Sequence, residues 1–237
     1  LLAPLIGFTK ANSWADAAAR TAGYEDDTVL SGGAISKSDR TSRELSSRDL
    51  QLLAAFFATM PGRSGEPVRV LDIGGAAGDH FDLIAGSRPD ATFEWTVLET
   101  AKLAARMQPR TNGHSQVKWI DDIEGVNASQ DIALLSSVLQ YVEQPHELIE
   151  RASRAAGVLI INRLPLIDAT EDVPTVQKLR MYGYRGSYPA WFLSKEKFSA
   201  RIHQIGEIVT RWQVPEDTHV LGVRSVVCEG MVVRVER

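Results

Sequence analysis

The chain has 237 residues, of which 44% are hydrophobic and 24% are charged, as in ordinary globular proteins. The net charge is −4, which argues against a nucleic-acid-binding protein because such proteins usually carry a basic excess. The single cysteine, Cys228, excludes an internal disulfide and any site built from several cysteines.

The opening LLAPLIGF is apolar but has no basic leader or cleavage site, so we do not interpret it as a signal peptide. No apolar run reaches about 18 residues, so we expect no membrane span and a cytoplasmic location. Helices are predicted at Ser13–Gly23 and at about Ser46–Met60. The polar stretch Asp26–Arg43 has no clear period. We expect residues 1–64 to form a helical cap, or lid, over the rest of the chain.

After Pro67, apolar runs alternate with helix-like segments. The runs resemble buried parallel strands: Val68–Ile73, Thr92–Leu98, Gln116–Ile120, Asp131–Ser136 and Gly157–Asn162. The predicted helices between them are Asp79–Ser87, Ala101–Arg110 and Pro145–Ala155. This alternation predicts an α/β fold with a doubly wound parallel sheet, and residues 65–237 should form one compact core.

The tail of the chain has a different pattern. Two strand-like runs, Glu207–Val214 and Ser225–Glu236, flank the turn-rich string PEDTHVLG. Strands joined by so short a loop pair in antiparallel fashion, so the tail is predicted to be a hairpin.

The most informative string is VRVLDIGGAAGDH, Val68–His80, in which a strand leads through small residues into a helix. Small residues let the backbone turn tightly and let a ligand approach it closely. The string lacks both the Gly-x-Gly-x-x-Gly pattern of dinucleotide sites and the Gly-Lys-Ser/Thr of a P-loop. An acid before the glycines, Asp72, suits a ligand with a cation beside its carboxylate, such as S-adenosylmethionine (SAM).

The segment Asp72-x-Gly74-x-Ala76-x-Gly78 resembles the first motif of class I SAM-dependent methyltransferases, with Ala76 in place of the middle glycine. The resemblance implies a Rossmann-like seven-stranded sheet of order 3-2-1-4-5-7-6 with an antiparallel last strand. It also implies SAM as cofactor and S-adenosylhomocysteine (SAH) as product. GYEDDTVL, DIALLSSVLQYVEQP and SYPAWFLSKEKF resemble a little-characterised bacterial group of methyltransferases associated with surface-polysaccharide genes.

The resemblance also implies a cofactor site. Glu99, which ends the second predicted strand, would hold the ribose hydroxyls, and Asp121 and Asp122 would lie near the adenine. The end of the fourth strand would face the methyl group. The expected cofactor residues are Asp72, Gly74, Gly75, Ala76, Gly78, Glu99, Thr100, Asp121, Asp122, Ile123, Ser136 and Ser137.

Ligands of open parallel sheets bind beyond the carboxyl ends of the strands, which selects the candidate bases. His80 follows the first strand and His219 lies in the predicted hairpin loop, so both could deprotonate an acceptor hydroxyl. Asp168, after the fifth strand, is a third candidate, although a turn position explains it better. A surface or capping role is the commoner fate of any single histidine. We expect no metal.

The stretch Thr175–Lys197 is the expected substrate wall because it gathers aromatic and basic residues. Aromatic faces suit sugar rings or aromatic acceptors, and basic groups suit carboxylate or phosphate, so we expect a small anionic acceptor. A core aromatic cluster with a solvated basic rim is the alternative. The expected substrate residues are Tyr24, Gln140, Tyr141, Arg163, Tyr188 and Trp191.

These patterns predict a SAM-dependent O-methyltransferase that acts in line on the hydroxyl of a small sugar or secondary metabolite. No Asn/Asp-Pro-Pro-Tyr string follows the fourth strand, which disfavours methylation of bases or glutamine. Two alternatives stay open: an NAD(P)-dependent oxidoreductase on a similar fold, and a non-catalytic domain that keeps the SAM fold. Neither nucleic acid nor membrane is an expected partner, whereas a homodimer is compatible with the sequence.

Overall fold

The computed structural model describes residues 5–25, 44–62, 65–108, 116–126, 129–181 and 184–236. The stretch 26–43, which was predicted to be part of a lid, lies outside the described residues. In the described ranges no helix has both the length and the apolar character needed to cross a membrane.

Five parallel strands form the centre of the molecule in the order β4-β3-β2-β5-β6. They are β2 (Val68–Ile73), β3 (Phe93–Leu98), β4 (Val117–Ile120), β5 (Gln130–Ser136) and β6 (Ala156–Leu164). The connecting helices are α4 (Asp79–Ser87), α5 (Ala101–Met107) and α6 (Pro145–Ala155), with two 3-10 turns, η3 (Ile123–Gly125) and η4 (Leu139–Tyr141). The predicted strands and helices are confirmed to within a few residues because their apolar runs are covered on both faces.

The two C-terminal strands continue this sheet. β11 (Arg224–Val235) pairs antiparallel with β6 on one side and with β10 (Gly206–Leu221) on the other. The predicted loop PEDTHVLG is wrong, since β10 runs through it to Leu221 after a register irregularity between Val214 and Thr218. The turn lies at Gly222, and His219 therefore belongs to a strand.

Four further strands extend the sheet beyond β10. They are β1 (Leu5–Lys10), β8 (Val173–Met181), β9 (Tyr184–Ser194) and the short β7 (Leu166–Ile167), and the full order is β4-β3-β2-β5-β6-β11-β10-β1-β8-β9-β7. The sheet has 11 strands, so the expected count of seven is wrong, but its first seven strands, β4-β3-β2-β5-β6-β11-β10, follow the expected order 3-2-1-4-5-7-6 with β11 antiparallel to β6. β8 and β9 form an antiparallel hairpin. β1 lies between this hairpin and β10 and pairs with β8 on one side and with β10 on the other.

The N-terminal part is not purely helical, because β1 belongs to the sheet. It does contain the two predicted helices, α1 (Trp14–Ala19) and α3 (Ser47–Thr59). Ser13 caps α1 by accepting the N–H of Asp16, and Ser46 and Asp49 form a capping box at the start of α3. These caps explain why both helices begin where the sequence predicted.

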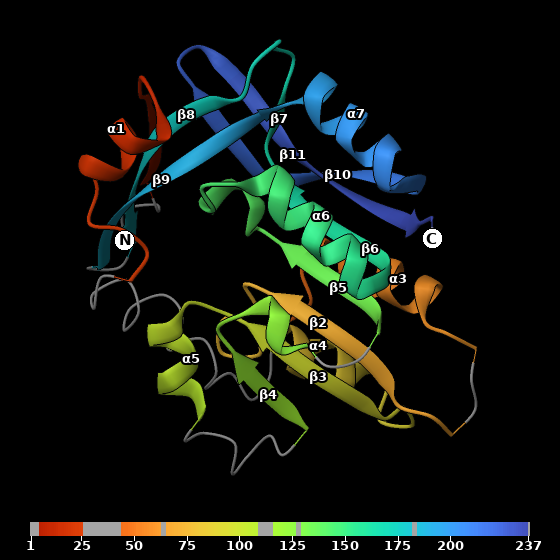
Figure 1. Cartoon of the computed structure of the whole chain (residues 1–237). Coiled ribbons are helices and arrows are strands. Elements are labelled where there is room, and N and C mark those ends of the chain that lie inside the picture. Colours follow the sequence, from red (N-terminus) through yellow and green to blue (C-terminus); the bar gives the residue numbers. More distant parts are fainter. Residues whose placement is uncertain are drawn as a thin grey trace.

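The apolar core lies on both faces of the sheet. One cluster packs α3, α4 and α5 on the strands and contains Phe56, Phe81 and Trp95. The other packs α6 and α7 (Lys195–Ile205) on the opposite face and contains Ile149 and Phe198. In Figure 1 the arrowheads of β2 and β5 point toward the side of the molecule where β9 and α1 lie. The carboxyl edge of the central strands therefore faces the added strands.

Candidate functional site

Three non-glycine residues near the carboxyl ends of β2, β5 and β6 have left-handed backbones. They are Ala76 with a φ of 49°, Ser137 with 58° and Arg163 with 61°. Such conformations cost about 1–3 kcal/mol each and persist where the surroundings enforce them, often at functional sites. All three are residues that the sequence predicted for the site.

The loop between β2 and α4 requires glycine at two adjacent positions. A Cβ on Gly74 would lie 2.7 Å from the Val138 side chain, and one on Gly75 would lie 2.3 Å from Oδ2 of Asp72. Gly78, with a φ of 93°, is the N-cap of α4, and no side chain caps the first amide groups of that helix. Gly74 and Gly75 are therefore packed too closely for side chains, and the loop ends in backbone donors.

Asp72 supports this loop from inside the protein. The carboxylate is fully buried and accepts the Trp95 Nε1–H at 3.2 Å. Nδ1 of His80 lies 3.0 Å from Oδ1 and 3.1 Å from Oδ2 of Asp72. Within the protein, the Asp72 carboxylate thus contacts Trp95 and His80 and lies against the loop.

His80 lies against the loop and is fixed by Asp72. Burial lowers the pKa of His80, but the charge and hydrogen bond of Asp72 outweigh it, so the pKa is raised overall. The positive charge of Arg163 acts against this rise in the His80 pKa. With Nδ1 committed to Asp72, Nε2 is the ring nitrogen left for other chemistry.

We expect the His80–Asp72 pair to make stability depend on pH. A pKa raised by folding contributes stability that is fully present below about pH 6.5 and is lost as the pH rises through the folded-state pKa. Urea unfolding of the wild type and of His80→Gln should therefore show a larger difference in free energy at about pH 5.5 than at about pH 8.5. His203→Gln, at an exposed helix position, is the control. A difference that is equal at both pH values would contradict the pairing.

Glu99 joins the loop to the start of α5. Oε1 accepts the N–H of Ala76 and Oε2 accepts the N–H of Thr100, both at 3.0 Å. Burial raises the pKa of the Glu99 carboxyl, and these two N–H groups oppose the shift. Beside it, the Thr100 hydroxyl is buried and lacks a hydrogen-bond partner among the described residues. The junction of the loop and α5 thus holds a carboxylate beside a buried hydroxyl.

Of the predicted cofactor residues after β4, Asp122 and Ile123 have structural roles, whereas Asp121 is exposed. Asp122 accepts the N–H of Glu124 at 3.1 Å and pairs with Arg151 at 3.2 Å, so it caps η3 and contacts α6. Ile123 is buried. Asp121 is exposed, and its carboxylate is the one left to face a ligand.

The predicted polar residues after β5 bind one another and the end of β6. The Ser137 hydroxyl accepts Nε2–H of Gln140 at 3.0 Å, and the same amide nitrogen lies 3.3 Å from the Arg163 carbonyl oxygen. The backbone N–H of Ser137 donates to the carbonyl of Asn162 at 2.9 Å. Ser136 is buried beside Asn162, with 3.5 Å between the Ser136 hydroxyl and the Asn162 amide nitrogen.

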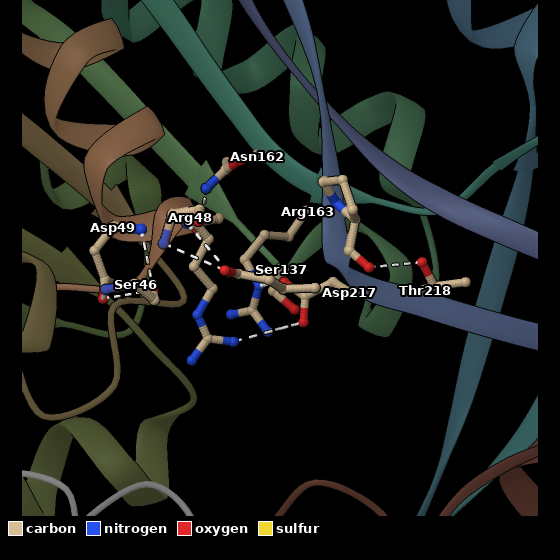
Figure 2. Close-up of polar contacts among 12 residues, drawn as sticks. Ser46, Arg48, Asp49, Ser137, Asn162, Arg163, Asp217 and Thr218 are labelled. Atoms are coloured by element: carbon tan, nitrogen blue, oxygen red, sulfur yellow. Dashed lines mark hydrogen bonds and ion pairs between the residues drawn. The ribbon is translucent and has the colours of Figure 1, made fainter. Parts of the chain in front are cut away.

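Arg163 forms a charged cluster with two residues that the sequence analysis missed. Figure 2 shows its guanidinium directed at Asp217 of β10, with Nε 2.5 Å from Oδ2 and Nη2 3.2 Å from Oδ1. Arg48, from the first turn of α3, lies 3.6 Å from Oδ1 of Asp217. Asp217 fell within the predicted loop and no motif marked it or Arg48, so only the fold reveals them.

Three predicted substrate residues form one aromatic cluster. The rings of Tyr24, Tyr141 and Tyr188 have centroids 5.5–5.9 Å apart in all three pairs. They come from the segment after α1, from η4 and from β9, respectively. The cluster therefore forms where the added strands meet the central sheet.

Three other predicted residues lie elsewhere. Trp191 stacks on Trp14 at 5.2 Å and donates Nε1–H to the carbonyl of Val142, so it fastens α1 to the chain after η4. His219 packs against Phe8 at 4.9 Å, and burial lowers its pKa. The Asp168 side chain is 90% exposed, 3.8 Å from Lys195. Of the three candidate bases, His80 is the one held against the glycine loop.

The basic residues of the predicted substrate wall do not face the tyrosines. Lys178, Arg180 and Arg185 are exposed, whereas their strand neighbours Gln177 and Tyr188 are buried. Lys195 pairs with Glu229 at 2.9 Å, and Lys197 pairs with Glu171. Successive side chains of a strand point to opposite faces, so Lys178, Arg180 and Arg185 lie on the face away from Tyr188.

No protein-family model and no curated protein matches the sequence. Solved structures do match. The N-terminal domain of EvdMO1 with SAH bound is 20% identical, with 81% of this chain and 83% of that chain covered and a TM-score of 0.52. The SAM complex of the glycopeptide N-methyltransferase MtfA is 11% identical, with 83% and 98% covered and a TM-score of 0.51. A structure described as a pericyclic reaction enzyme is 14% identical, with 88% and 50% covered and a TM-score of 0.51.

At these identities the likeness shows the fold alone. The chain has the Rossmann-like fold of SAM-dependent methyltransferases, in a mixed α/β sheet. Because a pericyclic enzyme shares the fold, the reaction has to be argued from the residues of this chain.

Proposed function

We propose that the protein is a SAM-dependent methyltransferase that methylates a hydroxyl group of a small molecule. The observation that carries this proposal is the Glu99 carboxylate, held 3.0 Å from the backbone nitrogen of Ala76 in a loop whose Gly74 and Gly75 have no room for side chains. SAM- and SAH-bound structures with the same fold support the choice of ligand.

The residues present fit this cofactor. The bare backbone of Gly74 and Gly75, followed by the uncapped start of α4, suits the charged amino-acid end of SAM. Glu99 would accept hydrogen bonds from the ribose hydroxyls, and the unpartnered Thr100 hydroxyl lies beside it. Asp121 would lie near the adenine. When bound, SAM supplies a methyl group already activated on a sulfonium.

The protein itself must then align the acceptor, exclude water and remove a proton from the acceptor hydroxyl. In this proposal Tyr24, Tyr141 and Tyr188 orient the acceptor and Arg163 lies at its polar side. His80 takes the proton at Nε2, because Asp72 holds Nδ1 and stabilises the protonated ring. His219 and Asp168 have no part in this step.

The acceptor hydroxyl would belong to a sugar or a secondary metabolite. The similarity of several strings to a bacterial group associated with surface-polysaccharide genes supports a sugar. The three clustered tyrosines support an acceptor that contains a ring, because aromatic faces pack well on ring compounds.

Calorimetry with SAH and with NADH tests the cofactor. We expect SAH to bind with a micromolar dissociation constant and NADH not to bind, since the loop lacks the dinucleotide pattern. Incubation with methyl-labelled SAM and a library of hydroxylated small molecules then tests the reaction. NADH binding without SAH binding would favour the oxidoreductase, and SAH binding without any labelled product would favour a non-methylating protein on this fold.

A further inference from the structure

Two buried amide oxygens near the tyrosine cluster accept no hydrogen bond from any residue that the structure describes. They are Oε1 of Gln140 and Oε1 of Gln177, and each side chain belongs to a residue that is 3% exposed. Burial raises the pKa of Tyr141, while the Arg163 charge and hydrogen bonds with the side chains of Gln177 and Gln140 oppose this shift. Nearly all buried polar atoms in proteins are paired, so two unpaired acceptors in one place call for an explanation.

The orientation of the Gln140 amide is fixed by its neighbours. Its nitrogen donates to the Ser137 hydroxyl and lies 3.3 Å from the Arg163 carbonyl oxygen. Exchanging nitrogen and oxygen would bring two acceptors together at Arg163, which is unfavourable. The Gln140 oxygen is therefore the atom left to accept a hydrogen bond.

Gln177 presents its amide from the other side of the cluster. It lies on β8 directly opposite Tyr188 of β9 in the antiparallel register. Opposed residues of such a pair share one face of the sheet, so Gln177 and Tyr188 point the same way. Lys178, the next residue, is exposed on the opposite face.

The Arg163 charge near the cluster is already paired. The Arg163 guanidinium is bound at two positions by Asp217, which also faces Arg48. An anionic acceptor would have to displace this carboxylate. A neutral acceptor that offers hydrogen-bond donors would instead satisfy the two amide oxygens and leave the Arg163–Asp217 pair intact.

We propose that the acceptor is an uncharged ring compound with at least two hydroxyl groups, which donate to the side-chain oxygens of Gln140 and Gln177. Its ring packs on Tyr141 and Tyr188. Tyr24, which is 38% exposed and is the outermost ring, moves aside to admit it. This inference rests on the proposed function, since it specifies the acceptor of the same site.

The test uses the full chain saturated with SAH and two matched sets of probes. One set is neutral, methyl hexopyranosides and inositols, and the other is the corresponding hexuronates with hydroxybenzoates. Calorimetry or ligand-observed NMR measures each affinity. We expect the best neutral ring compound to bind about tenfold tighter than its carboxylate counterpart. A tenfold change in affinity is roughly what the loss of one hydrogen bond causes. Tighter binding of the acids, or binding by none of the neutral rings, overturns the proposal.

Variants separate a binding role from a structural one. Gln177→Leu removes the amide at similar volume and should weaken the neutral ring about five- to tenfold. Because it also removes an unpaired buried acceptor, its melting temperature should stay equal or rise, whereas a structural role would lower it. Lys178→Met, the neighbour on the opposite face, should change affinity less than about twofold. SAH binding is measured for each variant, so failure of the cofactor site is distinguished from failure of the acceptor site.

Discussion

Replacing Glu99 with glutamine is expected to weaken SAH binding about 100-fold while the protein stays folded. Hydrogen bonds to a charged group contribute roughly 1.5–3 kcal/mol each, and the carboxylate would accept two from the ribose. The amide has one oxygen fewer, so its NH₂ would also face the N–H of either Ala76 or Thr100. Two donors facing each other would disturb the loop as well as the ligand contact. Titration calorimetry with SAH measures the effect.

Glu94→Gln is the matched control for this variant. Glu94 lies on the same strand, β3, but its side chain is 63% exposed and pairs with Arg69 at the surface. We expect its SAH affinity to stay within about twofold of the wild type, as for most exposed substitutions. Equal affinities for Glu99→Gln and the wild type would refute the assignment of Glu99 and remove the main support for the proposed function.

The second large effect is expected from Gly75→Ala. The added Cβ would lie 2.3 Å from Oδ2 and 2.5 Å from Cγ of Asp72, which cannot retreat because Trp95 and His80 hold its carboxylate. Overpacking of this kind costs about 1–3 kcal/mol or more, so we expect lower stability together with loss of detectable SAH binding. Urea unfolding and calorimetry on the same preparation separate the two losses.

Gly86→Ala is the matched control, because the same substitution at this position is expected to raise stability and not to lower it. Gly86 lies within α4, and a Cβ there would meet nothing within 4 Å. Alanine is the better helix former by about 1 kcal/mol, so this variant should be stabilised and bind SAH normally. If both variants behaved alike, close packing of the β2–α4 loop on Asp72 would not be the cause.

The central α/β unit and its glycine loop could be predicted from local sequence. The strands β2 and β5 are largely apolar, as expected of strands that are buried on both faces, and Ser13 and Ser46 mark helix starts through local side-chain caps. The glycine loop could also be predicted from the sequence, because tight turns and close packing restrict the residue type at each position.

The N-terminal strand and the continuation of β10 were missed for a common reason. β1 pairs with β8 and β10, which are far away in the sequence, and β10 passes through a string rich in turn formers. Pairing with a distant strand can override local propensity, and a single sequence does not reveal the partner. The predicted count of strands and the predicted position of His219 were wrong for this reason.

The composition of the substrate wall was read correctly, but its orientation was not. Thr175–Lys197 does hold tyrosines and basic residues, yet β8 and β9 point Gln177 and Tyr188 inward and Lys178, Arg180 and Arg185 outward. A shift of one residue in register would exchange these two sets. Composition alone cannot distinguish the two registers.

By itself, then, the sequence determined the elements whose formation depends on neighbouring residues: the buried parallel strands, the capped helices and the glycine loop before α4. Only the tertiary structure decided which distant side chains meet. It placed Asp72 beneath the loop with His80 and Trp95, bound Arg163 to Asp217, and gathered Tyr24, Tyr141 and Tyr188 near two amide oxygens that lack a partner among the described residues. Such contacts depend on strand pairing and register across the whole sheet, which local patterns do not encode.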